Sequence, residues 1–211
     1  MSASWRTVPM PPRVAELPRN SAGRPVPGNI AWHGVDDDGS ILLTRSPELG
    51  GHITCRCTPG LGTPVFGEQC PVRQREFMTR RRCGLCTKYI ATTEQLAFIG
   101  ETNAAYYLEP PLHLSCAAYA LQVCPRLHAA GDRIEVCLTH TYTLAEDRIT
   151  GMTPEGDLVR AKFRFGDPIA RDLAVLEFYL AFPDAPERRS GPAWLLAQQP
   201  RHDGEHPTPE R

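Results

Sequence analysis

Two closely spaced pairs of metal-ligating residues constrain this chain more than any other feature. Cys83-x-x-Cys86 is followed, after 26 intervening residues, by His113-x-x-Cys116. A spacing of two residues lets both side chains of a pair reach one ion, and a structural zinc takes four thiolate or imidazole ligands. The second pair lies at the start of a predicted helix, whose amino terminus favours thiolate. The sequence therefore predicts a structural zinc held by Cys83, Cys86, His113 and Cys116.

Two further cysteines bear on this site. Cys124 lies eight residues after Cys116, close to two helical turns, so it is an alternative to His113 as fourth ligand, or a buried core thiol. Cys137 stands alone in a predicted strand and is expected in the core, because free cysteine is among the most buried residue types. A redox Cys-x-x-Cys is the other alternative, but it belongs to a βαβ context that the sequence does not indicate.

A second group of candidate ligands precedes the first. It contains one histidine and three cysteines: His52, Cys55, Cys57 and Cys70. Gly60, Gly62 and Gly67 favour a loop that folds back and brings Cys70 toward the other two sulfurs. The group is a candidate for a second zinc. The alternatives are ordinary reduced thiols, or two of these residues completing the first site.

The cellular compartment decides how the eight cysteines are interpreted. The amino terminus lacks the apolar segment of a secretory signal. The apolar stretch 173–182 contains Glu177 and is too short to cross ~30 Å of hydrocarbon. We therefore expect a cytoplasmic protein without a membrane partner. In a reducing compartment, close cysteine pairs hold metal more often than they form disulfides.

The composition indicates short elements joined by many turns. Of 211 residues, 21 are Pro and 17 are Gly, together about 18% against a usual ~12%. We predict an α+β fold, with a zinc-ribbon or treble-clef-like module and a small C-terminal strand–helix unit. The expected parts are a disordered Pro/Arg-rich arm (1–28), the zinc-stabilised module (29–131), the C-terminal α+β unit (132–196) and a disordered tail (197–211).

Hydrophobic periodicity and turn residues place the individual elements. A hairpin is expected from strands 30–33 and 41–44 around a turn at 36–39, followed by a third strand at 51–57. Two strands in 89–109 would form a hairpin between the ligand pairs. Further strands are expected at 134–138, continuing toward 142, and at 158–165. Helices are expected at 71–82, 114–123 and 169–180, the last from the helical spacing of its apolar residues.

An arginine-rich run precedes the first ligand pair. It places five arginines within ten positions: Arg73, Arg75, Arg80, Arg81 and Arg82. Arginines on one helix face can bind the phosphates of a nucleic acid. The alternative is an ordinary solvent-exposed face whose arginines pair with acids such as Glu76. The formal net charge is −1, and no clear aromatic interleaving accompanies the run. Nucleic acid is therefore the second choice of partner, after a protein.

Catalytic signatures are scarce. No His-Glu-x-x-His, no zinc-deaminase signature and no phosphate-binding glycine loop occurs. A catalytic zinc needs an open coordination position, and the group around Cys55, Cys57 and Cys70 is the candidate for one. We therefore expect a protein that is not an enzyme, with a zinc enzyme as the third hypothesis.

Several motifs together carry a resemblance. They are the run from Pro64 to Arg75, the knuckle Cys83-Gly84-Leu85-Cys86, the run from Pro110 to Cys116 continuing to Cys124-Pro125, and the lead-in from Leu17 to Pro27. As a set they resemble a group of uncharacterised proteins from streptomycetes and actinobacterial phages, over residues 14–125. The resemblance implies a metal-binding scaffold with no established activity. Cys70 stands where the resemblance leads us to expect His, a replacement that keeps a metal ligand.

These observations favour a structural zinc-binding protein, with one or two zinc ions, that acts as an adaptor for a protein partner. Nucleic-acid binding through the Arg73–Arg82 face and zinc-dependent catalysis are the alternatives.

Overall fold

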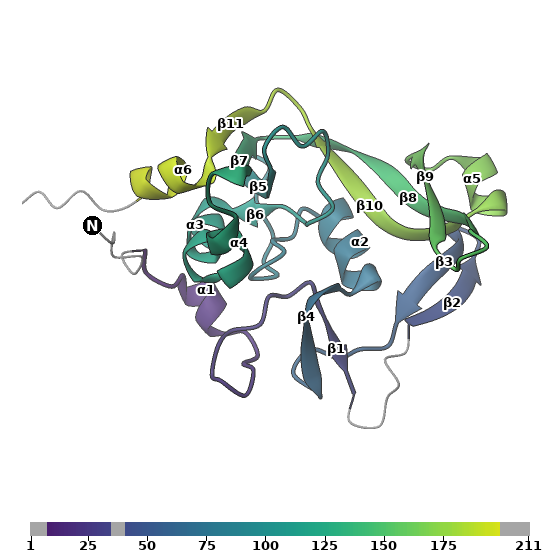
Figure 1. The fold of residues 1–211 in the computed structure, drawn as a ribbon, viewed down its shortest axis with the longest axis horizontal. Coiled ribbons are helices and arrows are strands. Elements are labelled where there is room, and N and C mark those ends of the chain that lie inside the picture. Colours follow the sequence, from purple (N-terminus) through teal and green to yellow (C-terminus); the bar gives the residue numbers. More distant parts are fainter. Residues whose placement is uncertain (1–7, 35–40, 199–211) are drawn as a thin grey trace, which may run out of the picture.

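A computed structural model describes residues 8–34 and 41–198 of the chain, and it combines helices with β-sheets (Figure 1). The α+β prediction is confirmed at this level. No helix in this part of the chain is long and apolar enough to cross a membrane. The elements in chain order are α1 (Pro12–Ala15), β1 (Ile30–His33), β2 (Ile41–Ser46), β3 (Gly50–Cys55), β4 (Thr63–Gln69), α2 (Pro71–Thr79), β5 (Leu96–Glu101), β6 (Leu112–His113), α3 (Leu114–Val123), α4 (Pro125–Ala130), the 3-10 turn η1 (Gly131–Arg133), β7 (Ile134–Thr139), β8 (Tyr142–Met152), β9 (Leu158–Arg164), α5 (Pro168–Leu173), β10 (Val175–Pro183), β11 (Glu187–Ser190) and α6 (Gly191–Ala197).

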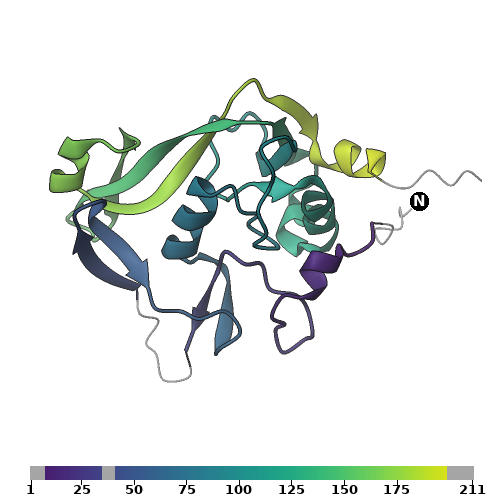
Figure 2. The same cartoon turned by 180° about the vertical axis from the view of Figure 1, so that it is seen from behind.

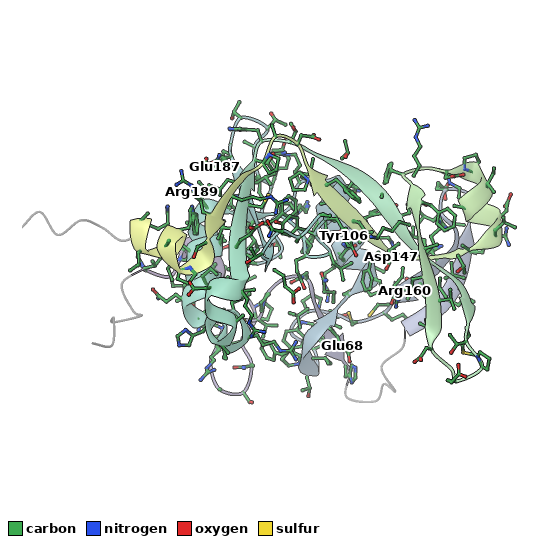
Figure 3. The ribbon with its side chains drawn as sticks, turned by 45° about the horizontal axis from the view of Figure 1, so that its top comes forward. Glu68, Tyr106, Asp147, Arg160, Glu187 and Arg189 are labelled. Atoms are coloured by element: carbon green, nitrogen blue, oxygen red, sulfur yellow. The ribbon has the colours of Figure 1, made fainter. Side chains whose placement is uncertain are left out.

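The largest sheet has the strand order β2-β3-β10-β8-β9. Its pairs are antiparallel except β3 with β10, which run parallel. Arg160 on β9 pairs with Asp147 on β8, and also with Glu177 on β10, so one guanidinium links three neighbouring strands (Figure 3). These pairs are partly exposed, and we expect them to fix register more than to add stability.

A second sheet has the order β11-β7-β5-β6, with α3, α4 and α6 gathered beside it (Figure 1). All six residues of β7 are buried. Apolar residues of β7 and α3 pack with Trp194 of α6 in one core cluster. The two-stranded sheet β1-β4 completes the fold.

Helix α2 lies between the two larger sheets (Figures 1 and 2). Its fully buried Gln74 accepts from the backbone N–H of Tyr179 (3.1 Å) and donates to the carbonyls of Tyr179 (2.7 Å) and Leu108 (2.8 Å). One side chain therefore supplies partners for backbone groups of two other segments, which are costly to bury unpaired.

Most predicted elements form as expected, and two pairings differ. The helices at 71–82 and 114–123 correspond to α2 and α3, and the strands at 30–33, 41–44, 51–57, 134–138 and 158–165 correspond to β1, β2, β3, β7 and β9. The hairpin of 30–33 with 41–44 is wrong, because β1 pairs with β4 and β2 pairs with β3. The turn predicted at 36–39 lies outside the described residues. The hairpin predicted within 89–109 is also wrong, because β5 pairs with β6 and β7 outside that range, and Tyr107, in the expected second strand, forms an isolated bridge to Ala181.

The predicted helix at 169–180 is also wrong. Helix α5 ends at Leu173, and the chain continues as β10, which pairs with β8 from Val175 to Pro183. The helical spacing of apolar residues is local, but β-branched and aromatic residues such as Val175 and Tyr179 favour strands. Pairing with β8 decides the outcome, because tertiary context overrides local pattern.

The structure also differs from the expected division into parts. Val8, Val14 and Val26 are buried, so residues 8–28 pack on the fold instead of forming a disordered arm. The boundary expected at 131 does not separate two units, since β10 pairs with β3 and β7 pairs with β5. Residues 1–7 and, beyond Gln198, the expected tail lie outside the described residues.

Candidate metal centres

The first centre gathers Cys83, Cys86, His113 and Cys116. Cys83 and Cys86 lie in the loop after α2, His113 ends β6, and Cys116 lies in the first turn of α3. All four are buried, and their ligand atoms lie within 4.8 Å of one another. Ligands about 2.3 Å from a tetrahedral ion are ~3.8 Å apart, so the group has the size of a metal site. These four residues can hold a metal ion.

The loop of the first pair is a tight turn with defined backbone hydrogen bonds. The Cys83 N–H donates to the carbonyl of Lys88 (2.9 Å), and the Thr87 N–H donates to the carbonyl of Cys83 (2.9 Å). Thr87 has φ 64°, in the left-handed region that β-branched residues rarely adopt. The Gly84 N–H donates to the carbonyl of Pro111 (2.9 Å), which ties this turn to the segment that leads into His113.

The orientation of His113 is set by its second nitrogen. Its Nε2 lies 3.1 Å from the carbonyl of Tyr89, and its Nδ1 lies 3.4 Å from Sγ of Cys86. A carbonyl only accepts, so this contact places the proton on Nε2 and leaves Nδ1 free to bind a metal in the neutral ring. Metal-binding histidines commonly donate their other N–H in this way.

Protons are unevenly shared within the group in the absence of metal. Hydrogen bonds with Cys116 and Cys83 lower the pKa of Cys86, whereas the hydrogen bond with Cys83 raises the pKa of Cys116. Burial acts to lower the pKa of His113, but hydrogen bonds and the charges of Cys83 and Cys86 outweigh it and raise this pKa to about 9. A metal that binds here must therefore displace protons.

The second centre gathers only the three cysteines of the predicted group. Cys55 ends β3, Cys57 follows two residues later, and Cys70 is the N-cap residue of α2. Their sulfurs lie within 4.8 Å of one another, with Cys70 buried and the other two half-buried. This group too can hold a metal ion.

His52 is not part of the second centre, although the sequence analysis placed it there. It lies three residues before Cys55 on β3, and positions three apart in a strand point to opposite faces. Its buried ring instead has Nδ1 3.0 Å from the carbonyl of Gly50. Cys124 lies outside both groups of ligands, between α3 and α4. Cys137 is fully buried, as expected.

The arginine-rich run is directed largely toward the protein itself. Arg75 is buried and donates to the carbonyls of Glu177 and Ile53. Arg81 donates to several carbonyls, that of His140 (2.8 Å) among them. The side chain of Arg80 is 69% exposed and pairs with Glu76, as does Arg82. Few of these guanidinium groups remain available as a phosphate-binding face.

Arg73 has a role that the sequence analysis missed. Its Nη2 lies 3.3 Å from Sγ of Cys57, and it donates to the carbonyls of Gly28 (2.8 Å) and Ile30. The pKa of Cys57 is lowered to about 4; the largest cause is the hydrogen bond of Cys57 with Cys70, and its hydrogen bond with Cys55 and the charge of Arg73 act in the same direction. The spacing Cys70-x-x-Arg73 places Arg73 in the first turn of the helix that Cys70 caps, but no sequence signal brings it to Cys57.

Comparisons with protein-family models, with curated proteins and with solved structures find no match to this chain. The resemblance to streptomycete and phage proteins therefore stays a prediction.

Proposed function

We propose that the protein is a structural zinc protein in which Cys83, Cys86, His113 and Cys116 hold one Zn²⁺. The observation that carries the proposal is the convergence of four buried ligand atoms, from two segments separated by 26 residues, within 4.8 Å. Three thiolates and one imidazole form a donor set characteristic of structural zinc. Because the three cysteines belong to the main hydrophobic cluster, the zinc would stabilise the core itself, and its binding free energy would be folding free energy.

The role that we propose for this scaffold is adaptor for a protein partner. A groove between β2 and α5 is lined by Leu43 and Leu173, which are 67% and 75% exposed. Beside it, β2 is an edge strand of the largest sheet. Exposed apolar residues next to an edge strand favour a protein or peptide that adds to the sheet.

The arrangement supports the two alternatives less well. The first centre has four protein ligands of its own and no open position for catalysis, so a zinc enzyme would depend on the group of Cys55, Cys57 and Cys70. A nucleic-acid interface needs free cationic groups, and most guanidinium groups of the Arg73–Arg82 run donate to carbonyls or pair with Glu76.

Thermal unfolding of matched cysteine variants tests the structural zinc. Cys116→Ser should lose one zinc per chain and unfold at a clearly lower temperature, because the ion is part of the core. Cys124→Ser, which removes a half-buried cysteine outside both groups, should keep the zinc content and the midpoint. Equal zinc content in the two variants would show that the ion lies elsewhere.

The adaptor role has its own test. Immobilised wild-type protein should retain a partner protein from an extract of its host. Leu173→Glu should keep the zinc and the thermal midpoint but no longer retain that partner. Val123→Glu is the matched control, since Val123 is an exposed apolar residue of α3. Retention of the same partner by Leu173→Glu would exclude the groove as the interface.

A further inference from the structure

The three-cysteine group differs from the first centre in one respect that decides its chemistry. Among the described residues, the His, Cys, Asp and Glu ligand atoms that converge there are those of Cys55, Cys57 and Cys70 alone. We propose that these residues form a second zinc centre with three protein ligands, whose fourth coordination position is taken by an exchangeable ligand from solution.

The local fold explains why three sulfurs converge without the predicted histidine. Cys55 and Cys57 flank one residue at the end of β3, and Gly62, with φ 88°, turns the following loop back close to the carbonyl of His33. Strand β4 then pairs with β1 and delivers Cys70 to the start of α2. His52 lies on the other face of β3, so it does not reach the ion.

Without metal, burial raises the pKa of Cys55, and the hydrogen bond with Cys57 together with burial raises the pKa of Cys70, so a metal must displace protons here too. Two contacts of the sulfurs nevertheless stabilise thiolates. The Cys57 N–H donates to Sγ of Cys55 (3.2 Å), and Cys70 caps the amino terminus of the nine-residue helix α2. Helix amino termini and N–H donors stabilise thiolates. Three thiolates around one Zn²⁺ leave a net charge of about −1, and the Arg73 guanidinium, 3.3 Å from Cys57 Sγ, is placed to balance it.

The Arg73 guanidinium is also held in place. It donates to the carbonyls of Gly28 (2.8 Å), Ile30 and Cys57 (3.3 Å). It therefore acts as a fixed counter-charge with a structural role, and it does not extend toward solvent as a phosphate-binding group would.

The accessibility of the group is consistent with an open position. Cys55 and Cys57 are half-buried, whereas all four residues of the first centre are buried. A tetrahedral ion bound by three thiolates has one position left, and water, a small thiol or an imidazole can occupy it. Thiolate ligands select thiophilic ions such as Zn²⁺ over Mg²⁺ or Ca²⁺.

The test uses the full chain loaded with Co²⁺, whose visible spectrum reports the ligands in a zinc site. Wild type and Cys124→Ser should bind two Co²⁺ per chain, and Cys57→Ser should bind one. Imidazole should change the spectrum of the wild type and leave that of Cys57→Ser unchanged, because only the second centre has an exchangeable position. Cys55→Ser provides an independent variant in case Cys57→Ser fails to fold.

Two results would overturn the proposal. The first is one Co²⁺ per wild-type chain, unaltered by Cys57→Ser or Cys55→Ser, which would leave the three residues as ordinary thiols. The second is two Co²⁺ with no spectral response to imidazole, which would mean that the protein supplies the fourth ligand. Both leave the first centre standing, so failure here is distinguishable from failure of the structural zinc.

Discussion

At the scale of single residues, the turn of the first ligand pair depends on a close approach between two segments. The Gly28 N–H donates to the carbonyl of Leu85 (2.9 Å), and a Cβ on Gly28 would lie 2.2 Å from Cγ2 of Thr87. Thr87 is itself held in the left-handed region. The structure therefore leaves no room for a side chain at position 28. The segment that carries Gly28 packs against the turn that holds Cys83 and Cys86.

Gly28→Ala should therefore destabilise the protein by about 1–3 kcal/mol, the usual cost of overpacking a tight site. The matched control is Gly151→Ala, because a Cβ at Gly151 meets no atom within 4 Å. Urea unfolding of both variants measures the effect. Equal midpoints would contradict the close packing of Gly28 on the turn.

The sequence predicted the four residues that converge at the first centre, because the spacing within each pair is a local feature. It did not exclude His52 from the second centre, although the alternation of side chains along the predicted strand at 51–57 already places His52 and Cys55 on opposite faces. It also did not predict the contact of Arg73 with Cys57 Sγ, because these two residues are brought together by the loop between β3 and α2.

At the scale of elements, β10 is the clearest case of long-range control. Its residues have a spacing typical of a helix, yet the segment pairs with β8 on one side and β3, more than 100 positions earlier, on the other. Helix α2 is attached to this strand through Gln74, which bonds both backbone groups of Tyr179.

Gln74→Leu tests that attachment. It would leave the N–H and carbonyl of Tyr179 and the carbonyl of Leu108 without this partner, at about 1–3 kcal/mol per unsatisfied group. With three groups affected, we expect a loss of unfolding free energy of at least about 3 kcal/mol, whereas Gln198→Leu, at an exposed helix end, should be nearly neutral. A neutral Gln74→Leu would mean that α2 is not held to β10 by these bonds.

At the scale of the whole molecule, the first centre and the main core coincide. Cys83, Cys86 and Cys116 pack in one cluster with residues that range from Val14 of α1 to Ala181 of β10. The α+β class and several elements could be predicted from local patterns. The sheet pairings that cross position 131 could not, because they join segments far apart in the sequence.

The zinc affinity of the first centre should depend on pH, because zinc competes with protons for its ligands. Without metal the pKa of His113 is raised to about 9, and that of Cys116 is raised as well. Both groups hold protons at neutral pH that zinc must displace, so affinity falls as pH falls, about tenfold per unit for each proton. In Cys57→Ser, chelator competition should give a Kd about 10⁴-fold higher at pH 6 than at pH 8, from two protons over two pH units. A Kd independent of pH would contradict this protonation pattern.

The most direct test of the central claim is X-ray absorption at the zinc edge on Cys57→Ser, purified without added metal, in which only the first centre can be complete. We expect one zinc per chain with three sulfur neighbours at about 2.3 Å and one nitrogen at about 2.0–2.1 Å. Four sulfur neighbours would replace His113 by Cys124 as the fourth ligand. Oxygen and nitrogen neighbours alone, or no zinc, would contradict the structural zinc centre.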